Sequence, residues 1–381
     1  MSMKKKLAMI LALSIACSVL FAGLSIKAFD FQNLYKEHQA NPSQITTDFQ
    51  LLLSDRGLMD SVLVLVNRQD GHAYPNQTEA LSDYDKVYDY YKFTDEPATV
   101  FARARMGGGM SLARVSIDTP FLSPLQLDLN ITGGLSIYYN YEDPMRIIGI
   151  DGQYFYGAEA SLGSLIAMRA GWYHTSTHYG DWMLYRLTSD PVYNARCNSD
   201  ESDPEHIYGL ERYLRMNDFQ VGLEIKPLDS LRLYAELNWA PRKMMGMDPW
   251  PIIPEYAQND SNASIAESSS NGMTRPAYSD AYKAFVLSTG AEWTWPNKLG
   301  RLIAAYDLHL YQDGRTGYQV GYYDASNPWD ISHSIIVKQT FEKVTNANIG
   351  LVAGLHTGRF PFTMAFGQKC NYLAFGLSFN R

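Results

Sequence analysis

The chain has 381 residues, of which 46% are hydrophobic and 19% are charged, and its formal net charge is −8 at pH 7. This acidic balance disfavours a nucleic-acid partner, because such binding needs a basic surface to neutralise phosphates. The 27 tyrosines, 28 glycines and 7 tryptophans are unusual for a soluble domain. Tyrosine and tryptophan are enriched at the two membrane–water interfaces, and glycine eases tight turns and strand bends.

The N-terminus has the order of an export signal. Lysines occupy positions 4–6, an apolar stretch covers residues 7–24, and Ala28 offers a small residue for cleavage. This order is typical of a secretory signal peptide, and no stop-transfer charges occur after it that would favour a permanent anchor. We therefore expect residues 1–28 to be a signal peptide that is removed on export. Cys17 lies inside the apolar stretch, so we do not expect it to be lipidated.

Residues 29–97 differ in character from the C-terminal part of the chain. They are polar and fairly acidic, with a helix-like piece at 83–91 and one apolar run at 62–66. We interpret this region as an N-terminal periplasmic extension or plug, and a flexible spacer with one edge strand is the alternative. After the leader, no apolar stretch is long enough to be a membrane-spanning helix. The two cysteines beyond the leader, Cys197 and Cys370, either pair or stay free.

From residue 98 to residue 381 the pattern changes to a period of two. Side chains alternate across a β-strand, so alternation of apolar and polar residues indicates a strand with one apolar and one polar face. The pattern recurs at 146–159, 231–239 and 301–310. Its clearest instance has an apolar face made by Leu125, Leu127, Leu129 and Ile131.

The connections between these strands predict a closed barrel. Short turns at 141–144, 227–230 and 296–300 contrast with long polar connections at 187–211 and 241–281, as in outer-membrane barrels. A bilayer forbids an open sheet edge, because unpaired backbone groups there meet no water. We therefore predict an all-β fold, a closed antiparallel transmembrane β-barrel of about twelve strands, with a short N-terminal periplasmic extension. A secreted β-sandwich is the alternative, but it should have shorter strands and less tyrosine.

The end of the chain supports an outer-membrane location. The final strand carries an apolar stripe made by Leu373, Phe375, Leu377 and Phe379. Such a terminal aromatic strand resembles the signal that the barrel-assembly machinery uses. We therefore expect that machinery and outer-membrane lipids as partners, and the bacterial outer membrane as the destination of the exported chain. The oligomeric state stays open.

Residues 169–181 are the segment most suited to chemistry. His174 and Ser176 are in phase with an apolar stripe, whereas Arg169 is on the opposite face of the strand. Arg169 would be costly facing lipid, so we expect it to face the lumen. His174 and Ser176 then lie on the lipid-facing wall near an interface. On the next strand, Asn217 is in phase with the apolar stripe and approaches His174 if the two strands pair in a suitable register.

These three residues suggest nucleophilic acyl transfer. Ser176 would attack an ester carbonyl, His174 would take the proton of its hydroxyl, and Asn217 would hold the imidazole. The segment resembles the H-x-S box of the outer-membrane phospholipase A family and, loosely, that of lipid A deacylases. In those families the His and Ser lie on the outer face of the barrel, and in the phospholipases an Asn on the following strand completes the site.

A broader resemblance covers residue 98 to the end of the chain. The chain is similar to a family of uncharacterised bacterial outer-membrane proteins with an H-x-S-S-H-x-G-D-E box. Thr177 and Trp182 depart from that box. This resemblance implies the barrel fold and no particular activity. The matching residues are His174, Ser176, His178, Gly180 and Asp181.

Several other interpretations stay open. His174, His178 and Asp181 are a weaker candidate for a metal site, and the acidic loop at 200–205 makes calcium a candidate cofactor. We assign no residue as a metal ligand or cofactor contact. The hypothesis for function is a lipid acyl-ester hydrolase in an outer-membrane barrel. The alternative is a non-enzymatic barrel that acts as a narrow porin, an adhesin or a structural protein, and for a barrel of this size we favour an interior filled by salt bridges.

Overall fold

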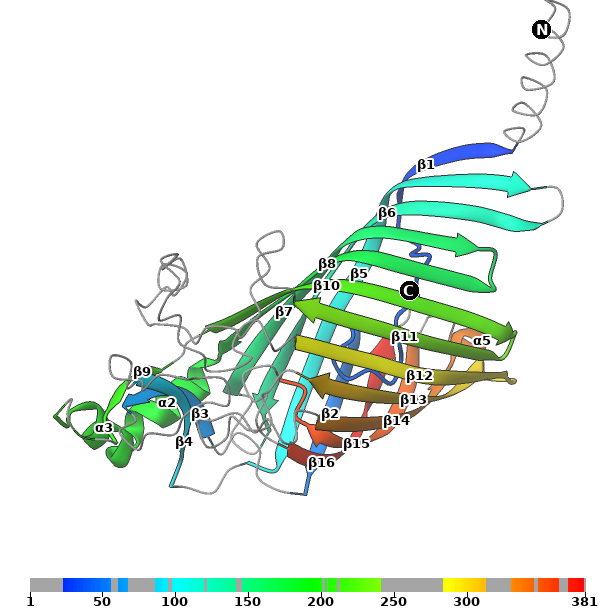
Figure 1. Ribbon diagram of the computed structural model, residues 1–381. Helices are drawn as coiled ribbons and strands as arrows, with labels where there is room; N and C mark the ends of the chain where they lie inside the picture. Colours follow the sequence, from blue (N-terminus) through cyan, green and yellow to red (C-terminus); the bar gives the residue numbers. More distant parts are fainter. Residues whose placement is uncertain are drawn as a thin grey trace, which may run out of the picture.

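The computed structural model shows one large antiparallel sheet that closes on itself (Figure 1). Its strand order is β1-β5-β2-β16-β15-β14-β13-β12-β11-β10-β8-β7-β6, and β5 also pairs with β6. Because β6 is the last strand of that order, this pairing joins the two sides of the sheet into a barrel. The structure describes residues 23–55, 61–67, 86–94, 98–119, 122–141, 146–200, 203, 205–210, 213–240, 284–312, 330–345, 349–362 and 369–379.

Twelve strands make up the barrel wall in this described part of the chain, which confirms the predicted fold class. All pairings between them are antiparallel. The strands are β2 (Asp48–Ser54), β5 (Val100–Thr119), β6 (Leu122–Asn140), β7 (Arg146–Leu162), β8 (Ile166–Tyr179), β10 (Tyr213–Leu228), β11 (Leu231–Ala240), β12 (Ala284–Pro296), β13 (Arg301–Gln312), β14 (Asp330–Thr340), β15 (Ile349–Arg359) and β16 (Lys369–Phe379).

The alternation in the sequence sorts side chains between the outside and the lumen. On β6, Leu127, Leu129 and Ile131 are exposed on the outer face, whereas Asp128 and Asn130 between them are buried. The predicted stripe of the last strand is likewise exposed along β16. An apolar exterior with closed edges suits a bilayer, where each unpaired backbone group would cost several kcal/mol.

The connections differ in length between the two ends of the barrel. Residues 163–165 and 229–230 join strand pairs at one end, which we call the short-turn end. At the other end, the long-loop end, residues 180–212 join β8 to β10. The turn expected at 141–144 lies at the long-loop end, because it comes after β6, which runs in the direction of β8. The second predicted long loop, 241–281, lies outside the described residues.

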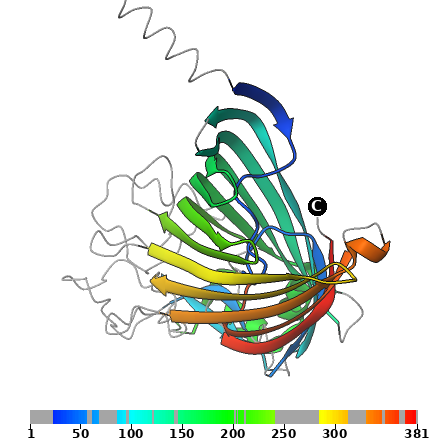
Figure 2. The same ribbon diagram turned by 90° about the vertical axis from the view of Figure 1, so that its right-hand side faces the viewer.

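Residues 31–47, which we call the inner segment, run inside the curved sheet (Figure 2). Carboxylates of the wall accept hydrogen bonds from its backbone amides, and these contacts come from three different strands. The contacts are Leu34 N to Glu159 Oε2 at 2.9 Å, Lys36 N to Glu224 Oε2 at 3.1 Å, and Gln39 N to Glu292 Oε1 at 2.6 Å.

Arginines of the wall bind backbone carbonyls of the same segment. Arg232 Nη2 donates to the Glu37 carbonyl at 2.5 Å, and Arg103 Nη1 donates to the Pro42 carbonyl at 3.2 Å. The wall therefore binds both amide and carbonyl groups of the peptide backbone that crosses its lumen, and buried backbone needs such partners. The domain boundary expected at residue 98 stays a prediction. Two parts of the chain before that residue belong to the barrel, since the inner segment lies in the lumen and β2 lies in the wall.

Ion pairs fill much of the remaining lumen, as we expected for a barrel of this size. Arg114 lies 2.7 Å from Asp128, and Arg169 lies 2.5 Å from Glu236. Each of these four side chains is more than nine-tenths buried. Buried charges need such partners, because an unpaired charge in a low-dielectric interior is very costly.

A small cap lies beyond the long-loop end of β7 and β8 (Figure 1). The cap consists of β3 (Ser61–Asn67), β4 (Lys86–Lys92), β9 (Ile207–Leu210), α2 (Asp181–Ser189) and α3 (Pro191–Cys197). Its strands form a second sheet in the order β4-β3-β9. Trp182, Met183 and Leu187 of α2 are buried in an apolar cluster that continues to Phe360 and Phe362 at the barrel mouth. The cap and the mouth therefore share one core.

The remaining described elements are β1 (Leu24–Asp30) and α5 (Glu342–Thr345). The β1 strand pairs with the short-turn half of β5. It overlaps the end of the expected signal peptide, and removal of that peptide stays a prediction. None of the helices in the part of the chain that the structure describes is both long and apolar enough to cross a membrane. Cys197 and Cys370 are not joined by a disulfide bond.

Candidate functional site

Strand β8 presents two of the three predicted catalytic side chains, His174 and Ser176, on the outer wall. Ala167, Arg169 and Thr175 are buried on the lumen side, whereas Met168 and Ala170, in phase with Ser176, are exposed. Arg169 points inward to Glu236, which is the orientation that the sequence reasoning required. The row that continues outward along β8 is therefore Trp172, His174, Ser176 and His178.

Ser176 meets an imidazole on this outer row. Its Oγ lies 3.2 Å from Nε2 of His178, and the contact is exposed. Ser176 and His178 are two positions apart on the strand, so their side chains point to the same face. The sequence hypothesis gave the role of base to His174 and considered His178 only as a metal ligand. The described hydroxyl–imidazole contact instead involves His178.

His174 packs against the neighbouring strand. Its ring stacks on that of Tyr154 with a centroid distance of 4.6 Å and an interplanar angle of 24°. The strand register explains this contact, because Tyr154 of β7 stands directly across from His174. Aromatic rings at such positions are typical of a membrane interface.

Strands β8 and β10 pair in the register that the sequence hypothesis needed to bring Asn217 close to His174. Asn217 stands directly across from His174, and Arg215 stands directly across from Ser176. Residues directly opposite in an antiparallel pair have Cβ atoms about 4.5–5.5 Å apart. The backbone therefore places all three predicted catalytic positions within one small area of the wall.

No side chain flanks the Ser176 hydroxyl at the position directly across from it on β7. Gly152 of β7 stands directly across from Ser176 and carries no side chain. A Cβ at this glycine would meet Leu135 Cδ2 and the Ser176 carbonyl oxygen at 3.6 Å, which is ordinary contact. A larger side chain would rise beside the hydroxyl, whereas glycine leaves that approach open.

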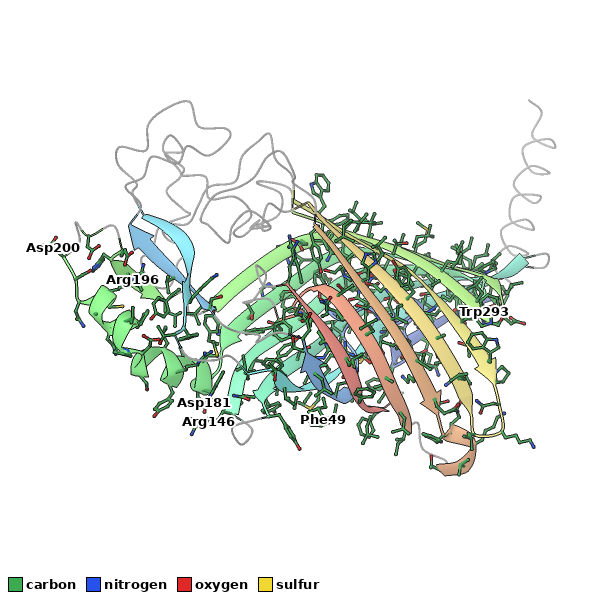
Figure 3. All side chains as sticks on the ribbon, turned by 90° about the horizontal axis from the view of Figure 1, so that it is seen from below. Phe49, Arg146, Asp181, Arg196, Asp200 and Trp293 are labelled. Atoms are coloured by element: carbon green, nitrogen blue, oxygen red, sulfur yellow. The ribbon has the colours of Figure 1, made fainter. Side chains whose placement is uncertain are left out.

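The site lies at the end of the barrel nearest the cap. Strand β8 ends at Tyr179, and Gly180 connects it to α2. A Cβ at Gly180 would lie 2.2 Å from the Ile147 carbonyl oxygen, so this sharp turn requires glycine. Figure 3 shows Arg146 and Asp181 at the junction of barrel and cap, with Trp293 toward the other end. The Arg146 guanidinium lies 5.6 Å from the Tyr185 ring centre.

The described residues offer little to a metal ion. Asp181 Oδ1 accepts a hydrogen bond from the Trp182 amide at 2.8 Å. In the acidic loop, Asp203 Oδ1 accepts one from the Glu205 amide at 2.9 Å, while Glu201 lies outside the described residues. No group of three or more His, Cys, Asp or Glu side chains gathers as a metal site within the described ranges.

No family model matches the sequence, and no curated protein matches it. Several solved outer-membrane barrels are similar in fold. Outer membrane phospholipase A from Escherichia coli has 10% identity and a TM-score of 0.39, covering 84% of this chain and 92% of that chain. The Salmonella typhi outer membrane phospholipase dimer with bound calcium has 11% identity and a TM-score of 0.38, covering 84% and 90%.

The transport unit of the autotransporter AIDA-I from Escherichia coli has 11% identity and a TM-score of 0.31, covering 92% of this chain and 93% of that chain. Enzymes and transport proteins therefore both occur among these similar structures. At such values the similarity concerns barrel architecture alone and carries no information about chemistry.

Proposed function

We propose that the protein is a bacterial outer-membrane β-barrel, exported by the leader at its N-terminus. The support comes from the closed sheet, whose outer face is apolar and whose lumen holds paired charges. The aromatic stripe of β16 and the stacked pair Trp293 and Trp295, with ring centres 5.7 Å apart, suit assembly into a bilayer and contact with its interface. The partners proposed for this location are outer-membrane lipids and the barrel-assembly machinery.

Within this location, we propose that the barrel hydrolyses acyl esters of membrane lipids at Ser176. The observation that carries the proposal is the 3.2 Å contact of Ser176 Oγ with His178 Nε2 on the outer wall. A lipid held in the outer membrane presents its ester carbonyls near the interface, at the height where aromatic side chains gather. The substrate then needs no passage through the lumen.

The chemistry follows from the two side chains. Ser176 Oγ attacks the ester carbonyl carbon while His178 Nε2 accepts the hydroxyl proton. The resulting imidazolium gives that proton to the departing alcohol oxygen as the carbon–oxygen bond breaks. Water then attacks the acyl-serine with the same imidazole as base and releases the fatty acid. A nucleophile and base in hydrogen-bond reach are the minimum that this reaction needs.

His174 and Asn217 form the other arrangement that the site permits. The register places them directly across from each other, next to Ser176. In this arrangement His174 is the base and Asn217 orients its imidazole, as first expected from the sequence. The described contact favours His178, and variants of the two histidines separate the two arrangements.

The test is hydrolysis of a phospholipid ester by full-length protein refolded in detergent, with and without added calcium. Ser176→Ala should abolish activity while the barrel still folds, as judged by heat-modifiable gel migration. Thr357→Ala is a matched control, because Thr357 is an exposed hydroxyl residue directly across from His333 elsewhere on the outer wall. Equal activity in wild type and Ser176→Ala would reject the proposal.

The second candidate function is a non-enzymatic binding protein that uses the cap. The observation that favours it is the shared core of cap and barrel mouth, which holds the cap in place for recognition. A narrow porin is less well supported, because the inner segment and the buried ion pairs occupy the lumen. Absence of esterase activity together with cap-dependent ligand binding would favour this function.

A further inference from the structure

Three glycines form a row across the outer wall that leads to Ser176. Gly108 of β5 stands directly across from Gly133 of β6, and Gly152 of β7 stands directly across from Ser176 of β8. Gly133 and Gly152 are diagonal neighbours, because Gly133 stands directly across from Tyr154, two positions further along β7. We call Gly108, Gly133 and Gly152 the glycine row. It is a strip of the wall that carries no side chains.

Strand periodicity shows that the glycine row faces outward. Side chains two positions apart lie on the same face of a strand. Met106, Leu135 and Tyr154 are each two positions from a glycine of the row, and all three are exposed on the outer wall. By the same criterion, the other glycines in the described parts of the wall strands have the phase of lumen-facing positions. The outward-facing glycines described in the wall therefore gather in one place, beside Ser176.

Packing within the barrel does not require glycine at two of these positions. A Cβ at Gly133 or at Gly152 would meet no atom of the described residues closer than 3.6 Å, and neither glycine has a positive φ. On the lumen side the situation is different, because a Cβ at Gly107 or Gly134 would collide with Ile45 of the inner segment. Glycine inside a strand weakens it and often marks a place where a ligand approaches closely. The outward glycines therefore leave room for a molecule outside the wall.

The glycine row runs from the interface toward the middle of the wall. Ser176 is close to the long-loop end of β8, since that strand ends at Tyr179, whereas Gly108 lies well inside β5, which runs from Val100 to Thr119. An ester of a membrane lipid is arranged in the same way, with its carbonyl near the interface and its chain toward the middle of the bilayer. The side chains that flank the row are uncharged and mostly apolar, and they are Met106, Met110, Ile131, Leu135, Ile150 and Tyr154.

The length of the glycine row suits one acyl chain. Three steps between neighbouring strands lead from β8 through β7 and β6 to β5. Neighbouring strands lie about 4.8 Å apart, so these steps cover about 14 Å. The hydrocarbon core of a bilayer is about 30 Å thick, so a chain that reaches its middle is about 15 Å long.

We propose that the glycine row holds the scissile acyl chain of the substrate, so that the protein acts on esters of long, unbranched fatty acids. This inference rests on the proposed hydrolysis at Ser176. The 3.2 Å contact of Ser176 Oγ with His178 Nε2 places the ester carbonyl at one end of the row, independently of the glycines. Association inside a bilayer depends on van der Waals contact, which small residues favour because they allow close approach. A straight chain can lie against the bare backbone, whereas a branched chain cannot approach it as closely.

The test compares p-nitrophenyl palmitate with p-nitrophenyl acetate as substrates of the full-length protein refolded in detergent. Gly133→Leu places a branched side chain in the row, two strands away from Ser176. It should lower kcat/KM for the palmitate ester by about tenfold or more and for the acetate ester by less than about twofold, because only the long chain reaches β6. Ala353→Leu is the matched control, since Ala353 is exposed on the outer face of β15, and it should change neither value. Equal effects of Gly133→Leu on the two esters would overturn the inference.

A binding measurement separates this inference from the proposed hydrolysis. Full-length Ser176→Ala protein is irradiated with palmitic acid that carries a photoreactive diazirine at its terminal carbon, and the labelled peptides are identified by mass spectrometry. We expect label on β5 beside Gly108, and competition by unmodified palmitic acid. Such labelling without ester hydrolysis by wild type would support the chain site and reject the hydrolase. Ester hydrolysis by wild type with label spread evenly over the wall strands would support the hydrolase and overturn the chain site, even if Gly133→Leu fails to fold.

Discussion

Arg232 Nη2 lies 2.5 Å from Glu292 Oε2 in the lumen of the barrel. The same guanidinium contacts the Glu37 carbonyl, and the other carboxylate oxygen of Glu292 accepts from the Gln39 amide. This ion pair therefore links β11 to β12 within the wall, and it also links both strands to the inner segment. Its two side chains are 14% and 7% exposed, so solvent screens the pair only weakly.

We predict that Glu292→Ala destabilises the barrel by about 3–5 kcal/mol, because it leaves the buried charge of Arg232 without its main partner. Urea unfolding of the refolded protein in detergent measures the change. The contrasting variant is Arg301→Ala, which breaks a more exposed pair with Glu342 and should cost less than about 1 kcal/mol. Equal losses in the two variants would contradict the role given to the buried pair.

Deleting residues 33–40 should open the lumen. These residues carry the amides and carbonyl that Glu159, Glu224, Glu292 and Arg232 bind. Without them, water replaces the inner segment in a lumen lined by charges, and ions can pass. Planar-bilayer recording should show steady conductance for the deletion variant and little for wild type. A wild-type barrel that conducts as well as the variant would show that the segment does not occlude the lumen.

The two histidines of the outer row should differ in their importance for ester hydrolysis. His178→Ala should lower kcat by about 10²–10⁴-fold, the usual loss on removal of a general base. His174→Ala should have a smaller effect, through the lost stacking on Tyr154. Asn217→Ala tests the other arrangement, since Asn217 stands across from His174. If His174→Ala and Asn217→Ala abolish activity while His178→Ala keeps it, His174 is the base.

The barrel was predictable from sequence because its signal is periodic and local. Alternation at Leu127, Leu129 and Ile131 against Asp128 and Asn130 shows directly which side chains meet lipid and which meet the lumen. The inward position of Arg169 followed from the cost of a charge in lipid. The same reasoning placed the row of His174 and Ser176 outward, and the structure agrees.

Other features depend on contacts that periodicity does not encode. Whether Ser176 meets His174 or His178 is decided by side-chain rotamers within one face, and both histidines share that face. The path of the inner segment depends on partners such as Glu292, more than 250 positions away in the chain. Spacing alone could not place it, although the many acids and arginines in the lumen were a hint that something polar fills it.

The cap should lose stability in acid through Asp190, which begins α3. Asp190 Oδ1 accepts hydrogen bonds from Tyr91 Oη at 2.7 Å and from the Val192 amide at 2.8 Å. Burial alone would raise the pKa of this carboxyl, but the bonds from Tyr91, Tyr193 and Val192 outweigh burial and lower the pKa below 3.8. A lowered pKa in the folded state means that the ionised group stabilises folding above about pH 4, and this contribution is lost as the pH falls through the folded-state value.

We predict that limited proteolysis of the cap speeds up below about pH 4 in wild type. Asp190→Asn should remove this acid sensitivity while keeping an oxygen that accepts at the start of α3. Asp190→Ala should destabilise the cap at every pH by about 1–2 kcal/mol, because the helix loses its N-terminal cap. Trp182 fluorescence reports on the same transition, since this residue is buried in the cap core. If cap proteolysis speeds up in acid to the same extent in wild type and in Asp190→Asn, another carboxyl group causes the acid sensitivity.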